Sequence, residues 1–191
     1  MDESILVVDK NAGVEVETGL AAELGSLYGE VRPLHRLDAN TEGLVAFART
    51  PEAEARLLRA FEERRVEKVY HAVVRGRLTE PGKLRDYVLK DAERALVRVV
   101  PPGTPGALAC ELSYVPLETD GERSLLEIRL ITGRTHQIRV QMAAFEHPVL
   151  GDDKYGDRDF NRRFRARGQR LLAKRLTIEG RGFTSLRELK L

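Results

Sequence analysis

The feature that most constrains the fold is a series of short apolar segments between residues 66 and 131, each of strand length. Turns rich in Pro, Gly and Asp separate these segments. Strands that follow one another directly pair most readily in antiparallel fashion, and runs of strands set apart from helices are typical of α+β proteins. The series therefore predicts an α+β fold with a mainly antiparallel, mixed central sheet and flanking helices. The segments are 66–78, 95–100, 108–115 and 125–131.

Helical signals lie mostly outside this series. Thr50 followed by Pro51 predicts a helix that begins there and reaches about residue 65, because Thr is a good N-cap and Pro suits the first helical turn. Thr132 and Gly133 predict the start of a second helix that extends to about Phe145. Further helices are expected at 19–28 and 157–168, and further strands at 5–8, 44–48 and 170–178. No repeat or linker divides the chain, so residues 1–191 are expected to form a single domain.

Composition excludes several classes of protein. Cys110 is the only cysteine, so no internal disulfide can form, and its apolar neighbours predict a small core residue. The sequence has no apolar run of 18 residues, and its first apolar stretch lacks a preceding basic region. We therefore expect a cytoplasmic protein with neither a membrane span nor a secretion signal.

A metal site is not expected either. The four histidines show no ligand spacing. The segment that begins at Asp38 resembles a calcium loop only faintly, because Arg49 stands where the bidentate Glu should be.

Charge is distributed unevenly along the chain. Residues 154–191 contain 12 Lys and Arg against 4 Asp and Glu, whereas the remaining residues contain 20 against 26. A basic end on a slightly acidic body suggests a polyanionic partner, with nucleic acid as the first candidate. A solvated helix face whose counter-charges come from elsewhere in the fold would give the same count.

Three polar clusters lie at the ends of predicted elements, at 35–38, 68–70 and 132–139. In the third, free backbone N–H groups beside Arg134 and Arg139 could bind a phosphate. Taken singly, each cluster also fits a structural role. Asp38 could form an Asx-turn, Tyr70 could be a core residue, and the two arginines could be exposed residues near a helix cap.

Taken together and in order, these clusters resemble the motifs of RluA-type RNA pseudouridine synthases. HRLDANTEGL is similar to the family signature H-R-L-D-x-x-T-S-G-L, EKVYHAVVRG to a K-x-Y strand, and LITGRTHQIRVQMA to T-G-R-x-H-Q-I-R. VVDKNAG is similar to the family opening V-x-K-P-A-G, and EHPVLGDDKYG to G-H-P-I-x-G-D-x-x-Y-G. The resemblance covers almost the whole chain and implies the catalytic-domain fold of this family.

The resemblance also implies the chemistry. The family breaks the bond between uracil and ribose, turns the base and rejoins it through carbon, without a cofactor or metal. Asp38 matches the catalytic aspartate, and Tyr70 the tyrosine that stacks on the flipped base and takes part in removing the proton from C5. Arg134 matches the arginine that pairs with the aspartate. Arg36 matches the arginine that helps to fill the space left by the base.

The substrate implied is structured RNA, either rRNA or a tRNA stem-loop, bound by a monomer. Within the matching motifs we expect four further residues to contact RNA, namely His35, Lys68, His136 and Arg139. We expect no separate RNA-binding domain before the core, so the basic end should contribute affinity through phosphate contacts. The arginines expected to make them are Arg162, Arg163, Arg165 and Arg167.

Three positions depart from the family pattern. Glu42 stands where Ser is usual, Asn11 where Pro is usual, and Gln141 where His is common. A second carboxylate beside Asp38 would favour its protonation, so we expect Glu42 to point to solvent.

Two other functions stay open at this level. The first is a catalytically degenerate protein that binds or folds RNA on the same scaffold; the presence of Asp38, Tyr70 and Arg134 argues against it. The second is an unrelated hydrolase that uses Asp38, for which the sequence shows neither a partner acid nor a water-activating base.

Overall fold

The computed structural model describes residues 4–91 and 93–191. The chain forms two compact units. The first contains residues up to Lys68 together with Leu172–Glu188, and the second contains Val69–Leu171 and Leu189–Leu191. Strand β4 (Glu67–Arg75) begins in the first unit and continues into the second. The single domain expected from the sequence stays a prediction.

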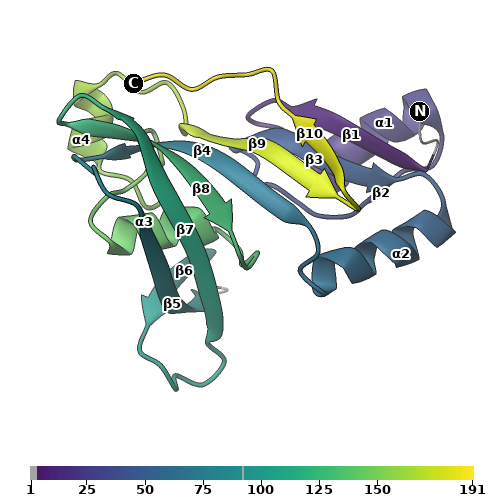
Figure 1. The fold of residues 1–191 in the computed structure, drawn as a ribbon, viewed down its shortest axis with the longest axis horizontal. Helices are drawn as coiled ribbons and strands as arrows, with labels where there is room; N and C mark the ends of the chain where they lie inside the picture. The colour runs from purple at the N-terminus through teal and green to yellow at the C-terminus, as the bar shows by residue number, and fades with distance from the viewer. Residues whose placement is uncertain (1–3, 92) are drawn as a thin grey trace. The chain divides into compact units, whose positions relative to one another are not determined.

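The first unit is built on a small mixed sheet. Strand β3 lies between β1, to which it is antiparallel, and β9, to which it is parallel; β2 and β10 pair with β3 and β9 in antiparallel fashion (Figure 1). The close approach of β3 and β9 requires Gly43, because a Cβ there would collide with the backbone of Ala173. The strands are β1 (Ile5–Lys10), β2 (Arg32–Pro33), β3 (Glu42–Ala48), β9 (Leu171–Ile178) and β10 (Arg181–Thr184).

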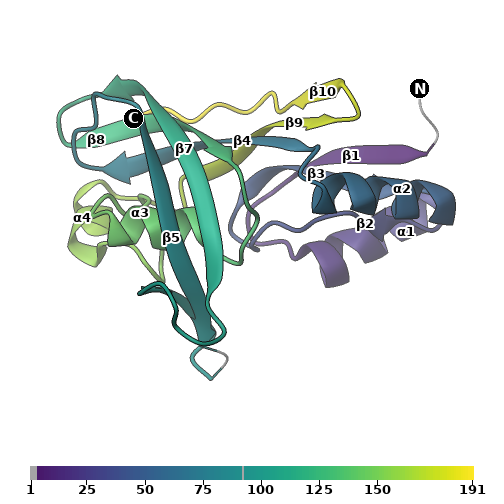
Figure 2. The ribbon, with the colours of Figure 1, turned by 60° about the horizontal axis from the view of Figure 1, so that its bottom comes forward.

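Two helices belong to this unit, and Figure 2 shows both on the same side of β1. Helix α1 (Ala21–Tyr28) follows a π-helical turn, η1 (Val16–Leu20). Helix α2 (Pro51–Glu62) begins as the sequence predicts, with the Thr50 hydroxyl accepting a hydrogen bond from the Ala53 amide at 3.2 Å. The buried face of α2 packs on apolar side chains of β3 and β9. The buried core comprises Leu34, Leu44, Ala46, Ala48, Ala53, Leu57, Ala60, Val66, Leu176 and Ile178.

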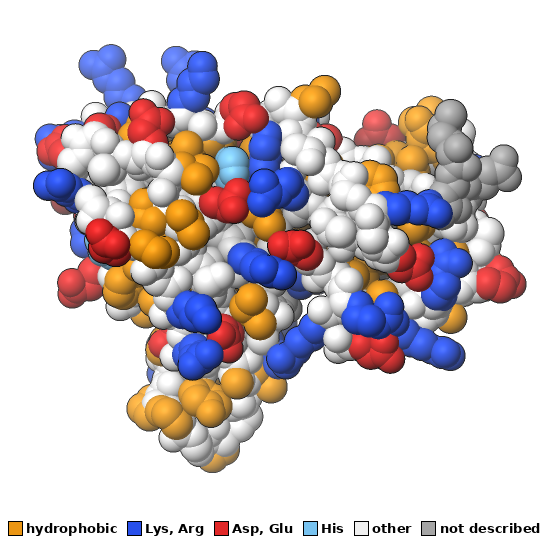
Figure 3. Space-filling model, in the orientation of Figure 1, with side chains coloured by type: hydrophobic (Ala, Val, Ile, Leu, Met, Phe, Trp, Pro, Cys, Tyr) orange, Lys and Arg blue, Asp and Glu red, His pale blue; other side chains and the backbone are white. Residues whose placement is uncertain are grey.

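The second unit contains an antiparallel sheet in the order β4, β8, β7, β5 and β6. The strands of the two units belong to one ten-stranded sheet, which confirms the prediction of an α+β fold with mixed, mainly antiparallel strands. Strands β5 to β7 form a long ribbon in Figures 1 and 2, and Figure 3 shows hydrophobic side chains at its tip, where Leu108 is exposed. Besides β4, the strands are β5 (Gly82–Asp91), β6 (Leu96–Val100), β7 (Leu108–Thr119) and β8 (Arg123–Leu130).

Helices α3 (Gln137–Ala144) and α4 (Arg158–Arg163) complete this unit. Helix α3 begins later than Thr132 and Gly133 suggested, because His136 has a left-handed backbone with φ of 55° and helical geometry starts only after it. Val140 of α3 packs against the ribbon, where Cys110 is buried as expected. Within the described part of the chain, no helix combines the length and apolarity needed to cross a membrane.

Candidate functional site

Asp38 lies in a tight turn that leads directly into β3. The Asp38 carbonyl accepts a hydrogen bond from the Thr41 amide at 3.0 Å, and Thr41 is buried. Asp38 itself is half-buried, and the neighbouring Ala39 carbonyl accepts from the Gly13 amide at 2.9 Å. The turn is therefore fixed both internally and to the loop that follows β1, while the Asp38 side chain keeps access to solvent.

A buried lysine supports this turn. The Nζ of Lys10 donates to the carbonyls of Asn11, Val14 and Ala39 at 2.8–2.9 Å, and the side chain is 2% exposed. Burial lowers the pKa of Lys10 to about 8, although the negative charges of Asp38 and Glu42 partly oppose the shift. At neutral pH a cation therefore lies within electrostatic range of Asp38 and joins the two loops.

His35 is held inside the first unit as a neutral ring. Its Nε2 accepts a hydrogen bond from the Ala46 amide at 3.1 Å, and its ring stacks on Phe61 with centroids 5.1 Å apart. Burial, reinforced by the charge of Lys68, lowers the pKa of His35 to about 3. Burial also lowers the pKa of Lys68. This geometry makes His35 an anchor of the turn on β3 and leaves it no positive charge for a phosphate.

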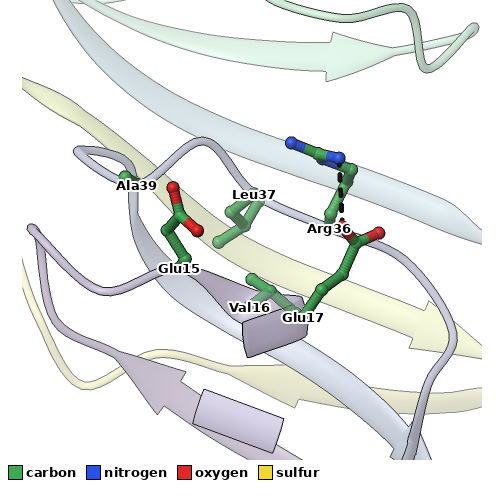
Figure 4. A pocket seen from close by; sticks show the side chains of 6 residues that line it. All are labelled: Glu15, Val16, Glu17, Arg36, Leu37 and Ala39. Atoms are coloured by element: carbon green, nitrogen blue, oxygen red, sulfur yellow. Dashed lines mark hydrogen bonds and ion pairs between the residues drawn. The ribbon is translucent and has the colours of Figure 1, made fainter. Parts of the chain in front are cut away.

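Arg36 has the opposite environment. Its side chain is exposed and makes an ion pair with Glu17, with Nη1 and Oε2 3.3 Å apart. Figure 4 shows this pair at the rim of a small pocket beside the Asp38 turn. Because an exposed ion pair contributes little stability, Arg36 can exchange Glu17 for another anion at little cost. The pocket is lined by Glu15, Val16, Glu17, Arg36, Leu37 and Ala39.

In the second unit, Arg134 lies in the turn before α3, where a side-chain amide fixes the backbone. The Arg134 amide donates to Oε1 of Gln137 at 3.0 Å, and the Thr132 hydroxyl donates to the same oxygen at 2.7 Å. Gln137 is 3% exposed and donates through Nε2 to the carbonyl of Glu111. The Nε of Arg134 donates to the Ala109 carbonyl at 3.1 Å, which orients the guanidinium.

Arg139 and His136 hold the loop that follows α3. Arg139 is 3% exposed, and its Nε and Nη2 donate to the two carboxylate oxygens of Asp152 at 2.7 and 2.9 Å. Arg139 also keeps the pKa of Asp152 below its usual value despite the opposing effect of burial. The Nδ1 of His136 lies 2.7 Å from the hydroxyl of Tyr155. With its guanidinium committed to Asp152, Arg139 is better suited to support the site than to contact RNA directly.

The structure thus divides the eight residues that the sequence predicted. His35, Arg36, Asp38 and Lys68 lie together in the first unit, whereas Tyr70, Arg134, His136 and Arg139 lie in the second. Tyr70 is on β4 opposite Ile128 of β8 and is 7% exposed. The roles of these residues, including a pairing of Asp38 with Arg134, stay predictions.

Several cations of the basic end have acidic partners within the protein. Arg162 pairs with Asp159 and Arg163 with Glu122, both in the second unit. Arg187 pairs with Glu42 at 3.0 Å, so Glu42 is half-buried in an ion pair, and the expectation that it simply points to solvent was wrong. Part of the charge counted at the basic end is therefore neutralised inside the protein.

Sequence reasoning assigned no role to Lys10, Gln137 or Arg187. Lys10 and Gln137 lie within motifs quoted for the resemblance, so the motifs themselves were the available signal. Arg187 lies outside every motif and 145 residues from Glu42. No sequence signal connected Arg187 with Glu42.

Comparisons with known proteins agree with the resemblance. The family described as RNA pseudouridylate synthase matches residues 4–144, a range that contains all eight predicted residues. The chain is 34% identical over 171 residues to ribosomal large subunit pseudouridine synthase D of Vibrio parahaemolyticus, covering 82% of this chain and 51% of that protein. It is 34% identical over 170 residues to synthase C of Vibrio cholerae, covering 84% and 53%. The chain thus spans about half the length of these relatives.

The structure is similar to that of human RNA pseudouridylate synthase domain containing 1. The TM-score is 0.83 at 28% identity, covering 97% of this chain and 80% of the human one. Human RNA pseudouridylate synthase domain containing 4 gives a TM-score of 0.76 at 21% identity, which supports the fold alone.

Proposed function

Because the chain belongs to the RNA pseudouridylate synthase family, we propose that it isomerises a specific uridine in structured RNA to pseudouridine. The observation that carries this proposal is the Asp38 turn, where the Thr41 amide fixes the backbone of a half-buried aspartate that lies within electrostatic range of the buried cation of Lys10. A nucleophilic carboxylate must be ionised and held in place; the nearby positive charge of Lys10 supports the first need and the fixed turn backbone supports the second.

In this proposal, Asp38 is the nucleophile that frees the uracil from its ribose. Arg134 pairs with the carboxylate and keeps it ionised, and its fork of donors suits that task. Tyr70 stacks on the flipped base and takes part in removing the proton from C5. Arg36, which needs to give up only an exposed contact with Glu17, enters the space that the base leaves.

We propose rRNA as the substrate, with a tRNA stem-loop as the second candidate. The relatives named above as ribosomal large subunit synthases support the first choice. Such a substrate implies a cytoplasmic protein, and we propose that it acts as a monomer without a metal. The exposed Arg165 and Arg167 would add phosphate contacts.

The test is to incubate the purified chain with unmodified transcripts of large-subunit rRNA, small-subunit rRNA and a tRNA pool, and to map pseudouridine at nucleotide resolution. The proposal expects one or a few positions in large-subunit rRNA. Modification confined to tRNA would transfer the assignment to the second candidate. The absence of pseudouridine in every RNA that the protein binds would favour a catalytically degenerate RNA-binding protein.

A further inference from the structure

Arg187 binds two segments that are remote from it in the sequence, namely the end of β1 with the loop after it, and the start of β3. It lies after β10, in the yellow segment of Figure 1. Its Nη1 donates to Oε1 of Glu42 at 3.0 Å, and its Nη2 donates to Oδ1 of Asn11 at 2.7 Å and to the Asp9 carbonyl at 3.2 Å. Its Nε lies 3.1 Å from Oδ1 of Asp9. One guanidinium therefore joins the end of β1, the loop after it and the start of β3.

The segment that carries Arg187 is itself firmly held. The Nζ of Lys174, on β9, donates to the carbonyls of Ser185 and Arg187 at 2.8 Å and to the carboxylate of Glu188 at 2.6 Å. The Ser185 amide donates to the Lys174 carbonyl at 2.9 Å, and Ser185 is 1% exposed. The backbone that carries Arg187 is thus fixed, so its guanidinium is held beside the two segments that it binds.

Both segments bound by Arg187 adjoin the Asp38 turn. Asp9 and Lys10 pair in register with Leu44 and Gly43, and Lys10 continues through its Nζ to the carbonyl of Ala39. Glu42 follows Thr41, whose amide closes the turn on Asp38. A shift of either segment that Arg187 binds would therefore displace the Asp38 backbone, because only one or two adjacent or hydrogen-bonded residues lie between them.

The two side chains that Arg187 binds outside β1 are also departures from the family pattern. Asn11 replaces Pro, which has no side-chain acceptor, and Glu42 replaces the shorter and uncharged Ser. Both replacements supply an oxygen to the same guanidinium. This shared partner gives a physical reason for two departures that appear unrelated in the sequence.

We propose that Arg187 is a positioning residue for Asp38, acting through Asn11, Glu42 and Asp9; this rests on the proposed role of Asp38 as nucleophile. The guanidinium fixes the two segments and neutralises the carboxylates of Asp9 and Glu42. The charged groups that interact with the guanidinium are these two carboxylates and Lys10, and the ion pair of Lys174 with Glu188 lies beside the Arg187 backbone. Without Arg187, uncompensated negative charge beside Asp38 would favour the protonated carboxyl group.

The test compares single-turnover rates at saturating RNA, over a pH series, for the wild type, Arg187→Ala and Arg187→Lys. We expect Arg187→Ala to lower the rate about tenfold and to move the acid limb to higher pH. Arg187→Lys should keep the acid limb of the pH profile at its wild-type position but retain only part of the rate, since Lys lacks the planar fork of donors of Arg. The matched control is Arg56→Ala, which breaks an exposed ion pair with Glu179 in the same unit and should leave both quantities unchanged.

A double substitution tests whether Arg187 acts through Asn11 and Glu42. In an Asn11→Pro and Glu42→Ser background, which restores the family residues, Arg187→Ala should lower the rate by a smaller factor than in the wild type, because only the contacts of Arg187 with Asp9 remain to be lost. An equal loss in both backgrounds would overturn the proposal, as would a lower melting temperature with an unchanged rate and pH profile.

One readout needs no RNA. Hydrogen exchange at the Thr41 amide should accelerate in Arg187→Ala but not in Arg56→Ala, because the Thr41 bond closes the Asp38 turn. If the wild type forms no pseudouridine, the proposed function fails, and this exchange rate still decides whether Arg187 positions the turn. Unchanged exchange would overturn the positioning role whatever the activity.

Discussion

The turn that carries Asp38 and the turn that carries Arg134 differ in the chemistry that holds them. The first turn is held by a buried cation, since Lys10 donates both to the carbonyl of Asn11 in the loop after β1 and to the carbonyl of Ala39 in the turn. The second is gripped by a neutral amide, since Gln137 accepts from the Arg134 backbone and donates to Glu111. Both supports are nearly inaccessible to solvent.

The difference follows from what each turn presents. A carboxylate in a partly enclosed site needs positive charge nearby to stay ionised, whereas arginine stays charged at any pH that proteins tolerate. A cationic support helps the first group and would repel the second. The supports should therefore differ in pH sensitivity, because Lys10 has a pKa of about 8 and an amide does not titrate.

The largest expected effect is the loss of the carboxylate itself. Asp38→Asn keeps the turn, because Asn makes the same local bonds, but removes the nucleophile. RNA binding should persist while pseudouridine formation falls at least a thousandfold, as measured in nucleoside digests. Turnover within about tenfold of wild type, a difference of about 1.4 kcal/mol in the barrier, would contradict the assignment.

A large effect is also expected at Arg134. Arg134→Ala should lower the single-turnover rate about a hundredfold and move the acid limb of the pH profile upward, because Asp38 would lose its proposed partner. Arg134→Lys should also be slow, although net charge is unchanged. If both variants lost only RNA affinity and kept the wild-type rate at saturating RNA, Arg134 would be a phosphate contact instead.

The supports of the two turns can be compared by replacing Lys10 or Gln137 with Met, a side chain of similar size. Lys10→Met and Gln137→Met should each lower the rate about tenfold, because each removes several buried hydrogen bonds. The wild-type rate should fall as pH rises through about 8, where Lys10 loses its charge, and this limb should vanish in Lys10→Met. Gln137→Met should keep the limb. Identical pH profiles for the two variants would remove the distinction between the turns.

The same lysine should leave a signature in stability. The pKa of Lys10 is lowered from 10.5 to about 8 by burial, so between these values the unfolded chain binds more protons than the folded one. The free energy of unfolding of the wild type, relative to Lys10→Met, should thus rise by about 1–2 kcal/mol from pH 7 to pH 9.5. Urea unfolding at the two pH values measures this; a constant difference would contradict it.

The smallest expected effect concerns the basic end. Replacing Arg165 and Arg167 by Gln should weaken binding of all RNAs and reduce the log–log salt slope by roughly 0.7 per lost contact. The matched variant replaces Arg162 and Arg163, which already pair with Asp159 and Glu122, and should change the slope less. Equal slopes for wild type and both variants would mean that the segment is a solvated face.

Local patterns predicted most of the fold. The Thr50 cap and the alternating apolar strands are local signals, and the structure confirms them. Strand β5 was not predicted as a separate strand, because its segment, GKLRDYVLKD, carries charged residues on both faces of an exposed ribbon. The late start of α3 depends on the left-handed conformation of His136, for which the sequence gives no clear sign.

The site was predictable to the extent that it lies in motifs. Asp38 and Arg134 were predicted in this way, and the family match spans both positions. The support by Lys10 requires two loops to meet, and the contacts of Arg187 join residues 145 to 178 positions apart. A charge count along the chain includes Arg187 and Lys174 in the basic end but cannot show their partners, whereas the fold pairs both with acidic side chains.

The central claim is that this chain converts uridine in RNA to pseudouridine, and a nucleoside mass balance tests it most directly. Wild-type protein is incubated with RNA labelled in the uracil ring, and the digest is resolved into uridine, pseudouridine and free uracil. The account predicts that each uridine lost appears as one pseudouridine, with no free uracil, and that Asp38→Asn forms neither product. Release of free uracil would identify a hydrolase, and tight binding with every uridine intact would identify a protein that only binds RNA; either result would contradict the account.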